Sequence, residues 1–171
     1  MHNQDPAEAI VRQYKLKPHP EGGFYKETYR SEAIIPVHAL PEGYPGPRNT
    51  STAILYLLKE GDFSALHRIR QDEIWHFYLG GALHLVMLSP DGDYMEVLLG
   101  KDVAAGERVQ YIVPAGWWFG AKPVSGVPYS FVGCTVSPGF DFEDFELGKR
   151  DSLLEQFPDR RETILAFTRE D

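Results

Sequence analysis

The sequence has a single cysteine, no long apolar run and a deficit of positive charge. Cys134 is the only cysteine among 171 residues, so no disulfide can form within the chain, and a cytoplasmic location is expected. No stretch approaches the roughly 18 consecutive apolar residues of a membrane span, and residues 1–10 lack the pattern of a signal peptide. The 17 basic residues are outnumbered by 25 acidic ones. We therefore expect no binding to nucleic acid and no association with a membrane.

Length and composition indicate one folded unit. The chain has 43% hydrophobic residues and 25% charged residues, which is an ordinary composition for a globular protein, and its 13% of aromatic residues is high. A chain of this length can bury one core and is short for two. We predict a single domain over residues 1–171.

Short apolar runs at close spacing predict an all-β fold. The runs are residues 24–31, 52–58, 63–68, 74–79, 83–88, 94–99, 109–113 and 129–136. Turn residues such as Gly80-Gly81 separate them, and no helical pattern lies between them. Such an arrangement favours an antiparallel sandwich or barrel.

Helices are predicted only at the two ends. Asp5 and Pro6 have the form of a helix start, and the helical pattern ends before Pro18. A second helical segment is predicted over residues 150–169. The proline- and glycine-rich residues 36–47 are expected to form an irregular loop, and the acidic, aromatic residues 139–147 an edge strand.

One motif places chemically active residues between two predicted strands. Gly61, His67, Glu73 and Gly80 are separated by five, five and six residues. His67 lies at the end of one strand and Glu73 at the start of the next, so we expect them to face each other. An imidazole beside a carboxylate suits either a metal site or an acid/base pair.

The spacing of these four residues resembles the first motif of the cupin superfamily. Gly106 with Pro114-Ala115-Gly116 resembles the second. The phrases HPEGGFYKETYRS, DEIWHFYLGG, VPAGWWFGAKP and GCTVSPGFDFEDFELG are similar to the cupin type 5 family, and they span residues 19–148. The resemblance implies a double-stranded β-helix, or jelly roll, of antiparallel strands that forms a homodimer.

The sequence departs from the metal-binding cupins at two ligand positions. The resemblance places Ile69 and Phe119 where those proteins carry histidines, so only His67 and Glu73 remain. Two protein ligands hold a divalent metal weakly. His76 could be a third ligand, but the period of a strand places it on the face opposite Glu73. We expect no cofactor, and a metal held by His67, Glu73 and His76 stays as the alternative.

The rings near this motif predict a small-molecule pocket. The predicted ligand-binding residues are Trp75, Phe77, Tyr111, Trp117, Phe119 and Tyr129. An aromatic interior with a few polar groups is typical of a ligand site, and the alternative is that these rings fill the barrel as core. Four tyrosines are candidate general acids, and their spacing selects none of them: Tyr25, Tyr29, Tyr111 and Tyr129.

Three functions follow from these residues. The first is metal-independent acid/base chemistry on a small polar, sugar-like ligand, similar to the sugar-nucleotide epimerases of the RmlC type. His67 would then remove a proton, Glu73 would hold His67, and a tyrosine would return the proton. The second is a binding module without catalysis, in which His67 and Glu73 only form hydrogen bonds. The third is a metal-dependent cupin enzyme. The sequence does not decide whether the protein is an enzyme.

Overall fold

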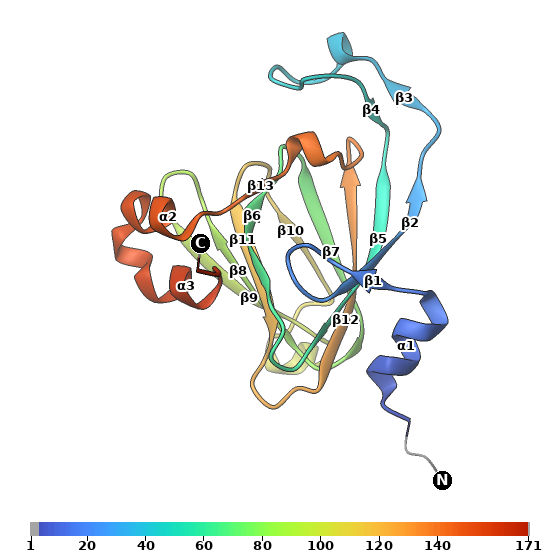
Figure 1. Cartoon of the computed structure of the whole chain (residues 1–171), viewed down its shortest axis with the longest axis vertical. Helices are drawn as coiled ribbons and strands as arrows, with labels where there is room; N and C mark the ends of the chain where they lie inside the picture. Colours follow the sequence, from blue (N-terminus) through green and yellow to red (C-terminus); the bar gives the residue numbers. More distant parts are fainter. Residues whose placement is uncertain (1–3, 171) are drawn as a thin grey trace.

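Two antiparallel sheets face each other and enclose the core, in a computed structural model that describes residues 4–170 (Figure 1). In spatial order the larger sheet holds β1 (Lys17–Pro18), β2 (Phe24–Arg30), β5 (Thr52–Lys59), β12 (Tyr129–Ser137), β7 (Asp72–Gly80) and β10 (Gln110–Val113). The second sheet holds β13 (Glu146–Leu147), β6 (Ser64–Arg68), β11 (Trp118–Pro123), β8 (Leu83–Leu88) and β9 (Tyr94–Leu99). The predicted all-β jelly roll is confirmed.

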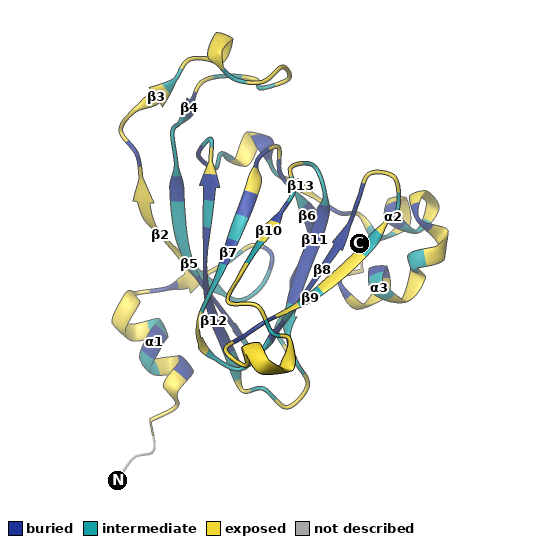
Figure 2. Ribbon diagram, turned by 180° about the vertical axis from the view of Figure 1, so that it is seen from behind, coloured by how far each residue is buried: buried dark blue, intermediate teal, exposed yellow. Residues whose placement is uncertain are grey.

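The core lies between the sheets because the strands alternate inward and outward residues. Along β7, Glu73 and Trp75 point inward and are buried, whereas Tyr78 is half exposed on the outer face. The strands β6, β8 and β11 are buried along most of their lengths (Figure 2). The central cluster joins Trp75 to Met87, Phe119 and Val132 across the two sheets.

The longest strand that the sequence-based prediction missed is β11. The segment Trp118–Pro123 forms β11, between β6 and β8, although no run was predicted between residues 113 and 129. Gly120 and Pro123 weaken the sequence signal for this strand, because glycine and proline are uncommon inside strands. Gly120 is required by packing, because a Cβ atom there would lie 2.9 Å from the carbonyl oxygen of Ser64.

Helices flank the sheets at both ends of the chain. The helix α1 (Pro6–Tyr14) begins where predicted, and the Asp5 side chain accepts a hydrogen bond from the Ala7 N–H at 3.0 Å. Its buried face packs on Leu57 and Phe131 of the larger sheet. The helices α2 (Arg150–Gln156) and α3 (Arg161–Ala166), joined by η4 (Pro158–Arg160), pack on β6, β8 and β11 of the second sheet. Among residues 4–170, no helix is both long and apolar enough to cross a bilayer.

An arm extends from the sheets between β2 and β5 (Figures 1 and 2). Its base is the short ladder of β3 (Ile34–Ile35) with β4 (Arg48–Asn49), and η1 (Val37–Ala39) is a single 3-10 turn near its tip. Residues 40–47 between η1 and β4 are irregular, as their prolines and glycines predict. A further 3-10 turn, η2 (Val103–Ala105), connects β9 to β10.

The prediction of an edge strand over residues 139–147 is wrong for most of that segment. It forms a 3-10 turn, η3 (Phe142–Asp144), and only its last residues pair with β6 as β13. Local hydrogen bonding decides this, since the Asp141 side chain accepts from the Glu143 N–H at 2.9 Å and closes the turn. The turn places aromatic side chains over one end of the space between the sheets.

Candidate functional site

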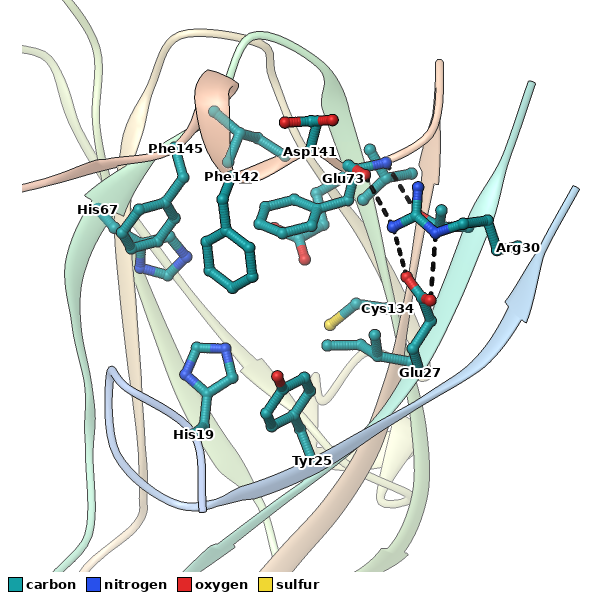
Figure 3. Close-up of a pocket in the computed structure, with 15 residues that line it drawn as sticks. His19, Tyr25, Glu27, Arg30, His67, Glu73, Cys134, Asp141, Phe142 and Phe145 are labelled. Carbon is teal, nitrogen blue, oxygen red and sulfur yellow. Dashed lines mark hydrogen bonds and ion pairs between the residues drawn. The ribbon is translucent and has the colours of Figure 1, made fainter. Parts of the chain in front are cut away.

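A cavity of about 400 Å³ opens between the two sheets at the end covered by η3 (Figure 3). Its walls combine residues of both sheets with the loop before β2 and the turn η3. The lining residues are His19, Tyr25, Glu27, Arg30, Thr52, Ile54, His67, Ile69, Glu73, Cys134, Val136, Phe140, Asp141, Phe142 and Phe145. Apolar surface with a few polar groups is the usual composition of a small-molecule site.

His67 projects into this cavity from β6. Its Nδ1 atom lies 2.7 Å from the carbonyl oxygen of Ala65, which can only accept, so Nδ1 carries the proton and Nε2 keeps a lone pair. Burial lowers the pKa of His67 to about 4, although the bond to Ala65 opposes this shift. The ring packs against Phe119 and Phe145, with centroids 4.1 and 5.3 Å away. His67 is therefore a neutral, oriented hydrogen-bond acceptor at neutral pH.

Glu73 enters from β7 in the opposite sheet. Burial raises its pKa from 4.5 to about 7. The Cys134 thiol and the Trp75 indole both oppose this rise in pKa. The indole N–H lies beside Glu73, but it does not meet the geometry of an ordinary hydrogen bond. The pKa of the Cys134 thiol is itself raised, mainly by burial and also by Glu73, so the thiol stays protonated. A large fraction of Glu73 is thus a neutral carboxylic acid near neutral pH.

The expected contact between His67 and Glu73 is replaced by a different arrangement. Residues 69–71 carry the chain from one sheet to the other, so the two side chains approach the cavity from opposite sheets rather than from neighbouring strands. Among the described residues, the bonding partner of the His67 ring is the Ala65 carbonyl rather than Glu73. Backbone geometry, and not the carboxylate, orients the imidazole.

His19 is a second imidazole in the cavity, and the sequence-based prediction gave it no functional role. Its Nδ1 atom accepts from the Glu21 N–H at 2.9 Å, so its Nε2 atom carries the proton. Burial lowers its pKa to about 4, with a smaller contribution from His67. The turn that follows it, with Gly22 and Gly23 at φ of 106° and 73°, brings the ring to the cavity. The Gly22-Gly23 pair, which indicates a sharp turn, was the sequence signal that could have pointed to His19.

Three phenylalanines of the η3 segment cover the cavity. The rings of Phe140 and Phe142 lie 5.0 Å apart in an edge-to-face arrangement, and Phe145 completes the cluster. Asp144 anchors this cover, because Arg48 holds its carboxylate through two bonds of 2.7 and 2.8 Å. Gln71 adds a third bond at 2.8 Å. The aromatic cover is therefore fixed to the base of the arm.

The one arginine that lines the cavity already has partners. Arg30 bonds both oxygens of Glu27, at 2.6 and 3.2 Å. It also donates to the Asn49 side chain and to the Phe140 carbonyl oxygen. The cavity wall therefore presents no uncompensated positive charge at this residue.

The six predicted ligand-binding aromatics do not line the cavity in the described structure. Trp75 and Phe119 are buried in the core beneath it, with ring centroids 6.2 Å apart. Phe77, Tyr111 and Trp117 pack against the same core, whereas Tyr129 belongs to the cluster under α1. Five of the six rings therefore pack in or against the interior core, which was the alternative interpretation.

The donor set does not fit the divalent metal of metal-binding cupins. Ile69 lines the cavity and Phe119 is buried where the second and fourth ligands would stand. His76 lies on the outer face of β7, where its Nε2 atom is 3.0 Å from the Thr135 hydroxyl. Within residues 4–170, no three His, Cys, Asp or Glu side chains are grouped to hold an ion.

Comparison with known proteins agrees with this fold. Residues 8–148 match the family model described as Cupin superfamily (DUF985). The uncharacterized protein YML079W of Saccharomyces cerevisiae is 30% identical over 154 residues, which cover 85% of this chain and 76% of that protein. The crystal structure of protein SO0799 from Shewanella oneidensis is 38% identical, with a TM-score of 0.86 over 98% of this chain and 100% of that one. A hypothetical protein from Leishmania major is 34% identical, with a TM-score of 0.90 over 97% and 100%. The chain therefore belongs to the Cupin superfamily (DUF985) family.

Proposed function

We propose that this protein is a metal-independent enzyme that moves a proton on a small, uncharged, sugar-like ligand. The observation that carries the proposal is the complementary state of two groups in one cavity. His67 presents a lone pair at Nε2, and Glu73 holds a proton near neutral pH. A base and an acid that are both ready at the same pH are what proton transfer requires.

The reaction step follows from these two states. His67 Nε2 takes a proton from the carbon next to a ligand carbonyl, the C–H electron pair forms a C=C bond, and the carbonyl π pair moves to oxygen. The Glu73 carboxyl then gives its proton to carbon, and the electrons return from oxygen. His67 ends as imidazolium and Glu73 as carboxylate, so a proton must pass back through the ligand or solvent to reset them. The net result is an epimerised or isomerised ligand.

The lining supports an uncharged ligand of modest size. A volume of about 400 Å³ is near the lower end of known ligand sites, which run from about 300 to 1,000 Å³. The cavity histidines are neutral, and Arg30 is engaged by Glu27. A charged group would be desolvated here without a free counter-charge, which is costly.

Among the four candidate tyrosines, Tyr25 is the one in the cavity. Its hydroxyl points toward the cavity centre (Figure 3), and its ring packs edge-on against His19 at 4.6 Å. Tyr29 is exposed, and Tyr111 and Tyr129 pack elsewhere. The similarity to RmlC-type epimerases, in which a tyrosine returns the proton, makes Tyr25 the residue to compare with Glu73.

The test is solvent-deuterium exchange into uncharged ketoses. Dihydroxyacetone and D-xylulose are incubated in D2O, and the loss of their α-proton NMR signals is followed. We expect exchange by the wild type that is unchanged by EDTA and abolished in His67→Gln. His84→Gln is the matched control, since that histidine bonds Glu96 on β9, outside the cavity. Wild-type rates in His67→Gln would reject His67 as the base.

A binding module without catalysis is the second candidate. It is favoured by the same donor and acceptor, because Glu73 and His67 are not bonded to each other and can each bond a ligand hydroxyl. Native mass spectrometry of the freshly purified protein distinguishes the two. A tightly held, unchanged ligand with no exchange of any ketose supports binding alone.

We also propose that the protein is a homodimer. The arm exposes Ile34 and Val37, and the outer face of the larger sheet exposes Tyr78 and Ile112. Apolar side chains gathered on an outer sheet face and an extended arm are suited to contact with a second copy. Light scattering should give twice the chain mass of 19.4 kDa, and the monomer mass would contradict the proposal.

A further inference from the structure

The two cavity imidazoles are held in opposite tautomers by the backbone. The Ala65 carbonyl accepts from His67 Nδ1, which leaves His67 Nε2 as an acceptor. The Glu21 N–H donates to His19 Nδ1, which leaves His19 Nε2 as a donor. Figure 3 shows the His19 ring pointing into the cavity, across from His67. A donor and an acceptor of fixed identity thus face one space.

From this geometry we infer that the Nε2–H of His19 donates a hydrogen bond to the ligand's carbonyl oxygen, and to the enolate oxygen that forms when His67 removes the α-proton. The inference rests on the proposed function and adds a named residue to it. It also defines the ligand more narrowly. The ligand must carry a carbonyl oxygen that reaches His19 while the adjacent carbon reaches His67.

Two other polar groups of the cavity, Arg30 and Thr52, are less suited to this role. Arg30 is occupied by Glu27, Asn49 and the Phe140 carbonyl oxygen. The Thr52 hydroxyl accepts from the Phe140 N–H at 2.9 Å, and so helps to hold the cover of the cavity. Among the described residues, His19 Nε2 makes no hydrogen bond, whereas the other ring nitrogen, Nδ1, accepts from the Glu21 N–H. The N–H of His19 is therefore available to a ligand.

The ring of His19 is oriented before any ligand arrives. The rings of Tyr25 and Tyr56 pack edge-on against it, with centroids 4.6 and 5.3 Å away. Tyr56 in turn donates to the Gly22 carbonyl oxygen at 2.5 Å, which ties the loop to β5. An oriented donor in a water-poor site stabilises developing negative charge strongly, because it needs no reorganisation during the reaction.

A structural role for His19 would use Nδ1, whereas the proposed role uses Nε2, so two substitutions can separate them. In His19→Asn, the side-chain oxygen can replace Nδ1 as the acceptor for the Glu21 N–H, and the cavity donor is lost. In His19→Gln, the longer amide can place its N–H near the position of Nε2, and the loop bond is lost. His19→Asn therefore removes the donor that Nε2 presents to the cavity, and His19→Gln removes the acceptor that Nδ1 presents to the loop.

We expect His19→Asn to lower the deuterium exchange rate of dihydroxyacetone by about 10²- to 10³-fold, as is usual for loss of one oxyanion donor. His19→Gln should stay within about tenfold of the wild type. Equal losses in both variants, or a larger loss in His19→Gln, would show a role in the loop only and would overturn the inference. Wild-type exchange in His19→Asn would overturn it as well.

A second measurement needs neither turnover nor a variant. Glycolohydroxamic acid is an uncharged mimic of the enediol, and its addition to the wild-type protein should move the His19 Nε2 proton NMR signal downfield. A bound hydroxamate that leaves this signal unchanged, or a protein that binds no hydroxamate, overturns the inference. Absence of ketose exchange by the wild type rejects the proposed function separately, since binding and exchange are measured apart.

Discussion

His67 and Glu73 approach one cavity from opposite sheets, and each is held by a different partner. The Ala65 carbonyl orients the His67 ring, whereas Glu73 lies beside Cys134 and Trp75. Burial without mutual pairing shifts both pKa values toward the neutral forms, downward for the imidazole and upward for the carboxyl. An ion pair between the two would have had the opposite effect. The cavity is thus set for proton transfer by neutral groups.

The exchange reaction should have a bell-shaped pH profile. His67 must be unprotonated to act as a base, so the rate rises as pH increases through its pKa of about 4. Glu73 must be protonated to act as an acid, so the rate falls as pH increases through its pKa of about 7. Measuring kcat/KM for ketose exchange across this range checks both limbs. A rate that keeps rising above neutral pH would contradict the role of Glu73 as acid.

Glu73→Gln should stabilise the protein relative to the wild type at high pH. Because the folded pKa of about 7 lies above the ordinary 4.5, the Glu73 contribution is fully present below about 4.5 and is lost as pH rises to about 7. The pKa difference corresponds to roughly 3 kcal/mol of unfolding free energy. Glu73→Gln does not lose this stability as pH rises. The unfolding free energy of the variant minus that of the wild type should therefore increase between about pH 5 and pH 8. Urea unfolding at the two pH values measures the change, and a constant difference would contradict a protonated Glu73.

The pair of Arg48 and Asp144 should be important for stability. Both side chains are buried, and the two bonds between them measure 2.7 and 2.8 Å. Arg48→Met leaves a buried carboxylate without its main partner, which typically costs about 3–5 kcal/mol. The double variant Arg48→Met with Asp144→Leu should lose less than Arg48→Met alone. Urea unfolding compares the three proteins, and equal stability of Arg48→Met and the wild type would contradict the prediction.

Gly22→Ala should be far more harmful than Gly61→Ala. Both glycines have positive φ, 106° and 86°, so each substitution incurs about 1–2 kcal/mol of backbone strain. At Gly61 a Cβ atom meets nothing within 4 Å, whereas at Gly22 it collides with the Phe63 carbonyl oxygen. Overpacking adds about 1–3 kcal/mol at Gly22.

The readout for this pair is twofold. Unfolding free energies give the difference in cost, and hydroxamate binding reports on His19, which the turn at Gly22 positions. Gly61→Ala serves as the matched control because its strain is similar and its surroundings are open. Similar losses of stability in the two variants would show that the close contact at Gly22 is relieved by movement of the loop.

The sequence predicted the fold well because strand period and turn residues are local signals. The runs at residues 83–88 and 94–99 became β8 and β9 with the same bounds. His67 and Glu73 were selected by their spacing, and both reach the cavity. The missing strand β11 contains Gly120 and Pro123, which weaken any local signal for a strand.

The arrangement of the site depended on contacts that the sequence does not encode locally. Residues 69–71 could equally join strands of one sheet or of two, so the separation of His67 from Glu73 was not predictable. His19 was given no role because its hydrogen bond comes from a backbone N–H two residues later, which no side-chain pattern reveals. Five of the six predicted aromatics pack in or against the central core, which contains Trp75 and Phe119, and the cavity lies at the end covered by η3.

The most direct measurement is a nitrogen-15 NMR titration of the His67 ring in the wild-type protein. We expect a neutral ring with the proton on Nδ1 and an unprotonated Nε2, and the ring should become charged only as pH falls toward about 4. A ring that is already an imidazolium near about pH 6, or that carries its proton on Nε2, would contradict the proposed base.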